Sequence, residues 1–188
     1  MESMRWSLLF VYALMAGGCD CGNGSDAIAE IGTGTTSFEL LEDGQDLELI
    51  AGQQGGYHFI VNASMAGIEP GTPSMPGLLS NPATSFGIFS EAGDRLDAQF
   101  PPYRLGYRER TDGSAMFQLP SGRILALADG VDPETLYDQR VELRVEIREE
   151  DGPRANDEVF IVAREGEPLP MVDAGPIDAG TDASSAAP

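Results

Sequence analysis

Nine consecutive residues in the last third of the chain, 140–148, alternate strictly between charged and apolar side chains. The apolar members are Val141, Leu143, Val145 and Ile147. A period of two places all four on one face of an extended strand, whereas a helix would spread them around its circumference. The charged members alternate in sign, so neighbouring strands can pair with them in water without net repulsion. This segment therefore predicts a β-strand with one buried face.

Similar short segments recur along the chain and are separated by turn residues. The other strand candidates are residues 38–42, 47–51, 57–64, 85–90, 103–107, 115–119, 123–128 and 158–164. Turn sequences rich in Gly, Pro and Asp separate several of them, and one helical turn is expected at 132–137, capped by Asp132. Since no long amphipathic helix is present, the pattern predicts an all-β fold, an antiparallel sandwich or barrel of about seven to nine strands.

The last third of this pattern resembles immunoglobulin-like domains. A single helical turn precedes the penultimate strand, and residues 140–149 and 158–164 form the expected final hairpin. The resemblance implies an antiparallel immunoglobulin-like β-sandwich, with Tyr137 as the corner tyrosine whose hydroxyl bonds to the backbone upstream. A jelly roll is the alternative arrangement of the same strands.

The N-terminal region contains a largely apolar run at 6–16 that is followed by small residues and a cysteine. The run is too short for a bilayer span of about 20 residues but suits a secretory signal peptide. Ala16-Gly17-Gly18-Cys19 resembles the lipobox of bacterial envelope lipoproteins. The resemblance implies a signal peptide at 1–18, acyl chains on Cys19, a flexible tether at 19–35, and attachment to an envelope membrane, at the outer membrane and periplasm or at the cell surface. Ordinary secretion with a Cys19–Cys21 disulfide is the alternative.

Residues 167–188 contain Asp-Ala-Gly twice and almost no bulky apolar side chain. Such a segment cannot bury enough surface to offset the entropy of ordering, so it is predicted to be disordered. It resembles the Asp-Ala-Gly-rich spacers of myxobacterial envelope lipoproteins. The β-sandwich domain is accordingly expected at 36–166.

The charge of the chain bears on its partners. There are 31 acidic residues against 11 basic ones, which gives a formal net charge of −20. A surface of this sign repels phosphate backbones, so no nucleic-acid partner is expected.

The chain contains a single histidine, His58, inside a strand candidate. Nucleophilic catalysis needs a base beside the nucleophile, and no Gly-x-Ser-x-Gly, phosphate-binding loop or His-Glu-x-x-His sequence is present. His58 is therefore expected to be a surface or packing residue. The sequence predicts no catalytic residues and no enzyme.

Two acid-rich segments are the weak candidate metal sites. Asp43 and Asp46 belong to the first, residues 42–46, and Asp151 and Asp157 to the second, 149–158. Carboxylate oxygens in loops suit Ca²⁺, although neither segment has the EF-hand spacing. The other interpretation is that both are solvated turns, so the expectation is no cofactor, with Ca²⁺ as the alternative.

These observations favour a non-enzymatic, lipid-anchored envelope protein that is a binding or structural module with a protein or glycan partner. A calcium-dependent adhesion or glycan-binding domain is the alternative, and a carboxylate hydrolase comes third. Binding residues usually lie in loops, and the longest irregular piece is residues 70–77, whose prolines stiffen it. The other interpretation of that piece is a crossover between two sheets.

Overall fold

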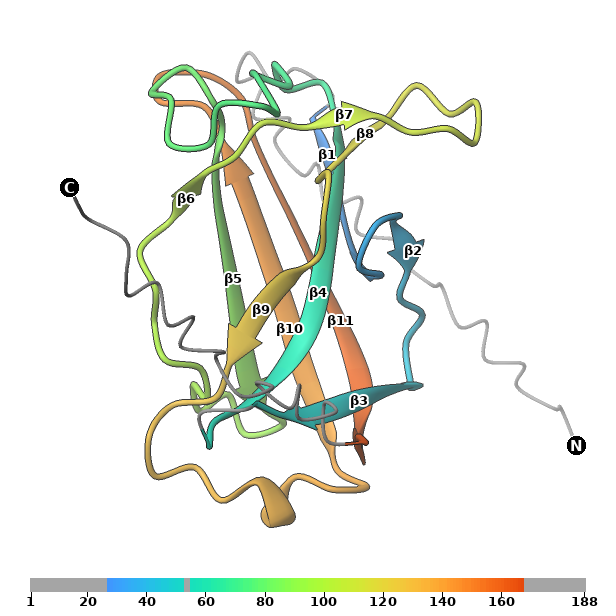
Figure 1. The fold of residues 1–188 in the computed structure, drawn as a ribbon, viewed down its shortest axis with the longest axis vertical. Coiled ribbons are helices and arrows are strands. Elements are labelled where there is room, and N and C mark those ends of the chain that lie inside the picture. The colour runs from blue at the N-terminus through green and yellow to red at the C-terminus, as the bar shows by residue number, and fades with distance from the viewer. Residues whose placement is uncertain (1–26, 53–54, 168–188) are drawn as a thin grey trace, which may run out of the picture.

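The computed structural model describes residues 27–52 and 55–167, which form an all-β body (Figure 1). The strands are β1 Ile28–Thr33, β2 Glu39–Leu40, β3 Gln45–Ala51, β4 Tyr57–Ala66, β5 Ala83–Ser90, β6 Tyr103–Arg104, β7 Arg108–Glu109, β8 Phe117–Gln118, β9 Arg123–Ala126, β10 Arg140–Arg148 and β11 Arg154–Glu165. The one helical element in those ranges is the 3₁₀ turn η1, Pro133–Thr135. No helix there has the length and apolarity needed to cross a bilayer. The prediction of an all-β fold is confirmed.

The strands form one mixed sheet that curls over itself. Its order is β2-β1-β4-β3-β11-β10-β5-β6, with β8 and β9 also paired to β4. β1 contacts β10 and β11 without pairing with them, so the two halves of the sheet face one another across the core (Figure 1). The side chains at the centre of that core are fully buried and include Phe59, Ile88, Leu143 and Ile161.

β3 joins the two halves. Residues 45–49 pair in parallel with β11, and Ile50 and Ala51 pair antiparallel with β4. A wholly antiparallel sheet was the expectation from the sequence, and this β3–β11 pair shows that expectation to be wrong in one place. The reason is that β3 lies more than 100 residues before its partner, so the direction of the pairing depends on how the whole chain returns.

β10 confirms the strongest local prediction. Its four apolar side chains are at most 1% exposed, and the strand lies between β5 and β11 near the middle of the sheet. Its partner β11 begins at Arg154, four residues before the predicted start at 158. Asn156 and Asp157 therefore belong to a strand and not to a loop.

β1 was not expected. The predicted tether extended to residue 35, but Ile28–Thr33 pairs with β4 and buries Ala29 and Ile31. The predicted start of the domain at residue 36 is therefore too late. The signal was the small alternating pair Ala29 and Ile31, which is weak because alanine offers little apolar surface.

The helical turn forms where it was expected. Asp132 Oδ1 accepts the N–H of Glu134 at 3.0 Å, and Pro133 occupies the first position of η1. Tyr137 follows this turn and packs half-buried at the edge of the core. Among the described residues no hydrogen bond joins its hydroxyl to upstream backbone, so the expected corner bond is not formed.

Candidate functional site

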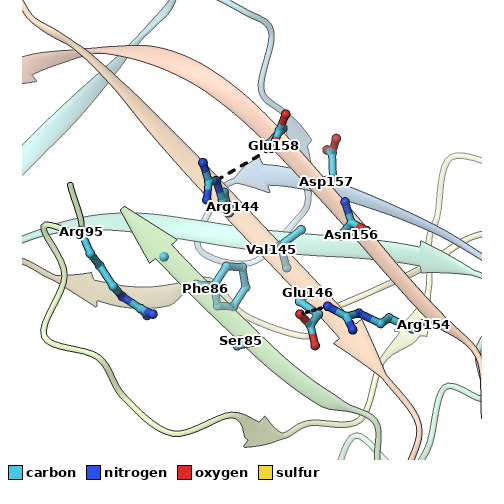
Figure 2. Close-up of a pocket in the computed structure, with 11 residues that line it drawn as sticks. Ser85, Phe86, Arg95, Arg144, Val145, Glu146, Arg154, Asn156, Asp157 and Glu158 are labelled. Atoms are coloured by element: carbon cyan, nitrogen blue, oxygen red, sulfur yellow. Dashed lines mark hydrogen bonds and ion pairs between the residues drawn. The ribbon is translucent and has the colours of Figure 1, made fainter. Parts of the chain in front are cut away.

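The outward face of β5, β10 and β11 carries an open groove of about 370 Å³ (Figure 2). Arginines and acids from neighbouring strands line it and pair with one another. Arg154 lies 2.7 Å from Glu146, and Arg144 lies 2.6 Å from Glu142. A hydrogen bond from Arg144, acting against desolvation, holds the pKa of the nearly buried Glu142 carboxyl below its ordinary value. The Arg154–Glu146 pair joins β11 to β10, whereas the Arg144–Glu142 pair lies within β10.

A glycine makes room for an aromatic ring on the same face. Gly87 pairs with Arg144 across the strands, and a Cβ at position 87 would lie 2.7 Å from Phe89 Cε2. The Phe89 ring therefore lies over Gly87, and the Arg144 guanidinium carbon lies 4.1 Å from the ring centre. This stack depends on the absence of a side chain at position 87.

We expect Gly87→Ala to lower the free energy of unfolding by about 1–2 kcal/mol, because the new methyl group displaces the Phe89 ring from its contact with Arg144. Urea denaturation measures the change. Ser85→Ala, two residues earlier on the same face, is the matched control and should stay within about 0.5 kcal/mol. Equal effects of the two substitutions would show that the stack is not specific.

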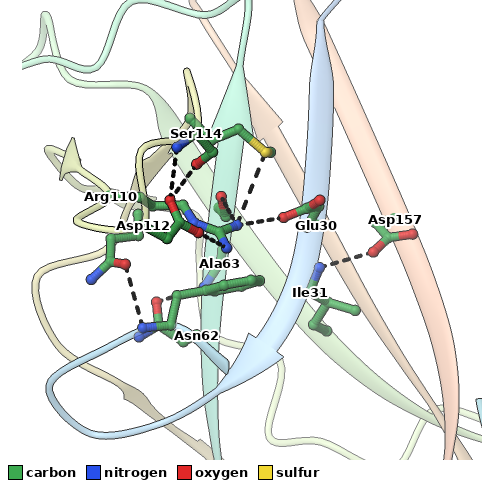
Figure 3. Close-up of polar contacts among 12 residues, drawn as sticks. Glu30, Ile31, Asn62, Ala63, Arg110, Asp112, Ser114 and Asp157 are labelled. Carbon is green, nitrogen blue, oxygen red and sulfur yellow. Dashed lines mark hydrogen bonds and ion pairs between the residues drawn. The ribbon is translucent and has the colours of Figure 1, made fainter. Parts of the chain in front are cut away.

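The weak metal candidates do not come together. Asp43 pairs with Arg140 at 3.3 Å and Asp46 with Arg164 at 2.9 Å. Asp157 Oδ2 accepts the N–H of Ile31 at 2.8 Å and so ties β11 to β1 (Figure 3). Asp151 is exposed in the turn before β11. Within 27–52 and 55–167, no group of three His, Cys, Asp or Glu side chains is arranged to hold a metal ion.

His58 and its strand neighbour Asn62 are both buried. His58 is 7% exposed in β4, and desolvation lowers its pKa, which agrees with the expected packing role. Asn62 starts a glycosylation sequon but is fully buried. Its Nδ2 donates to the Gly34 carbonyl at 3.2 Å, and its Oδ1 accepts the N–H of Ala63 at 2.8 Å (Figure 3). An acceptor asparagine has to be exposed, so in this fold Asn62 is a structural residue.

Arg110 lies at the centre of a second polar cluster, near Asn62 of β4 (Figure 3). It pairs with Glu30 of β1 at 2.9 Å and with Asp112 in the turn after β7. Hydrogen bonds from Ser114, together with Arg110, hold the pKa of Asp112 at about 2. The cluster ties β1 to the loop between β7 and β8 and leaves its charges paired.

A different surface lies beside β9, along the edge that does not pair with β4. Phe100, Tyr103, Gly122, Arg123, Ile124 and Ala126 line an open groove of about 340 Å³ there. Phe100 and Ile124 are 47% and 62% exposed, which is unusual for large apolar side chains. The groove follows the seam where β9 approaches the other half of the sheet.

The backbone of β9 is available beside this groove. In the described part of the chain β9 pairs along its length with β4 alone. Leu127 donates its N–H to the Tyr57 carbonyl at 2.9 Å, while the Ala126 carbonyl accepts from the N–H of Ala98 on the other side. Because the bonds alternate along an antiparallel strand, the N–H and C=O of Ile124 point away from β4, toward the groove.

A buried carboxylate shapes the opposite wall of the groove. Asp97 is 2% exposed and accepts the N–H groups of Ile88 at 2.9 Å and Gln99 at 3.0 Å. Gln99 adopts a positive φ of 52°, so the chain turns sharply immediately before Phe100. The Arg95 guanidinium donates two further hydrogen bonds to the Asp97 carboxylate, both of 2.9 Å. These contacts hold Phe100 at the mouth of the groove.

Arg123 differs from most other arginines of the body. Its guanidinium stacks on Tyr103 at 5.2 Å, and among the described residues no carboxylate lies within ion-pair distance of it. Eight other described arginines each have such a partner: Arg95, Arg104, Arg110, Arg140, Arg144, Arg148, Arg154 and Arg164. Arg108 also has no carboxylate partner in the described part of the chain, but its guanidinium donates to the Thr36 carbonyl. Arg123 is therefore the stacked arginine there whose guanidinium has no ionic partner.

Sequence reasoning missed this groove. Residues 123–128 were predicted as a strand and 103–107 as another, but nothing in either segment showed that they would lie side by side. The one local signal was Arg123 followed by Ile124, which places a charged and an apolar side chain on adjacent positions of a short strand.

The predicted signal peptide at 1–18, the cysteines Cys19 and Cys21, and residues 168–188 lie outside the described residues, so the lipid anchor stays a prediction. Comparison with known proteins finds no match, since no protein-family model, no curated protein and no solved structure is significantly similar to this chain.

Proposed function

We propose that this chain is a non-enzymatic binding module, held at an envelope membrane by lipid on Cys19, that docks an extended acidic peptide of a partner protein along β9. The observation that carries the proposal is the β9 groove, where Arg123, exposed apolar side chains and outward-facing backbone groups of Ile124 lie together. A peptide that adds a strand to a free sheet edge gains main-chain hydrogen bonds, and its side chains give specificity.

The side chains that line the groove indicate what kind of peptide it would bind. A carboxylate on the peptide can form charge-assisted hydrogen bonds with Arg123, which Tyr103 already holds in place. Apolar side chains next to that carboxylate can cover Phe100 and Ile124. The body itself is proposed to be an immunoglobulin-like sandwich, a proposal supported by η1 before β10 and by the β10–β11 hairpin.

Selection from a library of random peptides on the immobilised full chain tests the proposal. Enriched peptides are expected to carry Asp or Glu beside apolar residues, and Arg123→Gln should abolish the enrichment because the guanidinium is lost. Arg148→Gln is the matched control, since Arg148 is exposed on the outward face and pairs with Glu146 at 3.6 Å. Enrichment that survives Arg123→Gln, or binding of neutral glycans in place of peptides, would contradict the acidic-peptide assignment.

A further inference from the structure

The loop between β4 and β5 exposes three large apolar side chains close together. Met75 is 54%, Leu78 36% and Leu79 74% exposed. They belong to a stretch rich in proline and glycine that crosses from one half of the sheet to the other. We call Met75, Leu78 and Leu79 the apolar tip. Apolar side chains gathered in this way mark a contact surface more often than singly scattered ones.

The backbone beneath the apolar tip is pinned to the body. Asn81 is 1% exposed; its Oδ1 accepts the N–H of Thr72 at 2.7 Å, and its Nδ2 donates to the Met75 carbonyl at 2.9 Å. Arg104 donates to the carbonyls of Leu79 and Asn81, both at 3.2 Å. Several peptide groups of the loop, including the carbonyls of Met75, Leu78 and Leu79, are thus satisfied from within the protein. These groups would keep their partners if the tip entered a lipid interface.

The apolar tip lies at the end of the body where the described chain starts (Figure 1). Ile28, itself 51% exposed, pairs with Ala66, the last residue of β4 before this loop. Eight steps of chain separate Cys19 from Ala27 and span at most about 29 Å when fully extended. Lipid on Cys19 would keep this end of the body close to the membrane surface.

Acidic residues line the rim beside Leu79 of the apolar tip. The turn between β10 and β11 contains Glu149, Glu150 and Asp151, and Glu149 Oε1 accepts the N–H of Glu69 at 2.8 Å. Arg104 is the cation in this set and pairs with Glu150 at 3.3 Å. Such a rim is repelled by anionic headgroups and tolerates zwitterionic ones.

We infer that the apolar tip inserts into the zwitterionic lipid interface of the membrane that holds the anchor, so that the β4–β5 end faces the bilayer. This inference rests on the proposed lipid anchor at Cys19. Insertion would fix the orientation of the body and leave the groove beside β9 accessible from the side.

The test uses the full lipidated chain in phosphatidylcholine vesicles, with Cys21→Ser to leave one labelling site. A polarity-sensitive fluorophore on Leu79→Cys is expected to show a blue shift and to be quenched by nitroxide-bearing lipids. The same fluorophore on Glu134→Cys, in the exposed turn η1, is the control and should show neither effect. Adding phosphatidylglycerol should reduce the shift, and added salt should restore part of it.

The outcomes separate the two proposals. If the chain does not float with vesicles, the lipid anchor is wrong. If the chain floats but the fluorophore at position 79 stays in water, the anchor stands and the insertion is overturned. A blue shift in lipid-free Cys19→Ser protein that grows with protein concentration would assign the apolar tip to a second copy of the chain and would also overturn the insertion. Leu78→Ser should weaken the shift of a fluorophore on Met75→Cys without changing flotation, and an unchanged shift would contradict insertion of the tip.

Discussion

Replacing Cys19 by serine is expected to move the protein from the membrane fraction into the soluble fraction. Serine has no thiol to receive the first acyl chain, and the lipobox sequence then directs no lipidation. Buried acyl chains contribute about 0.8 kcal/mol per CH₂, so two or more chains give stable anchoring and none gives almost no affinity. The apolar tip alone offers too little surface to retain the body. Fractionation and intact-mass measurement of the purified protein report the change.

Cys21→Ser is the matched control for that experiment. It removes the only other cysteine and keeps the lipobox-like sequence Ala16-Gly17-Gly18-Cys19, so the protein should stay in the membrane fraction. If the protein is instead secreted with a Cys19–Cys21 disulfide, both serine variants behave alike and the wild-type mass carries no acyl chains. That result would contradict the anchor and every inference that rests on it.

Asp97→Ala is expected to lower the free energy of unfolding by about 3 kcal/mol, because two buried backbone N–H groups and Arg95 lose their acceptor. For a domain of this size the melting temperature should fall by about 10 °C. The wall that carries Phe100 should loosen as well, so peptide binding at β9 should weaken. Asp94→Ala, in the exposed turn before Arg95, is the control and should change stability by less than about 0.5 kcal/mol.

The same residue predicts a pH dependence. Desolvation opposes ionisation of Asp97, but hydrogen bonds from Arg95, Ile88 and Gln99 outweigh it and lower its pKa. A carboxylate whose native pKa lies below its unfolded value of about 3.9 stabilises the fold fully above that value. The contribution is lost as the pH falls through the native pKa. Wild-type stability should therefore drop more steeply than that of Asp97→Asn below about pH 4, and parallel curves would show that another group is responsible.

Local periodicity predicted the elements whose side chains alternate strongly. β10 is the clearest case, because its four apolar side chains share one face only when the segment is an extended strand. Burying that face then requires the strand to lie against the core. β4 was predicted at 57–64 and is buried on both faces, and η1 was predicted from the cap Asp132. β1 was not predicted, because the apolar side chains on its buried face are Ala29 and Ile31 and offer only a weak pattern.

The candidate metal sites show that acid-rich segments alone do not predict a metal site. Asp43 and Asp46 are close in sequence, but arginines of β10 and β11 reach them separately. Asp157 looked like a loop ligand only because β11 was expected to start later than Arg154. Acid-rich segments in an acidic chain are common, and only their partners show whether they are ligands.

The amino-acid sequence by itself determined the β class and the turn before β10, since each depends on residues within a few positions of one another. The lipid site at Cys19 is a prediction of the same local kind. Tertiary structure alone decided the parallel β3–β11 pair, the buried role of Asp97 and the β9 groove with its stacked Arg123. Each of those joins segments that are distant in sequence, and their contact depends on how the curled sheet closes over its core, which no local pattern encodes.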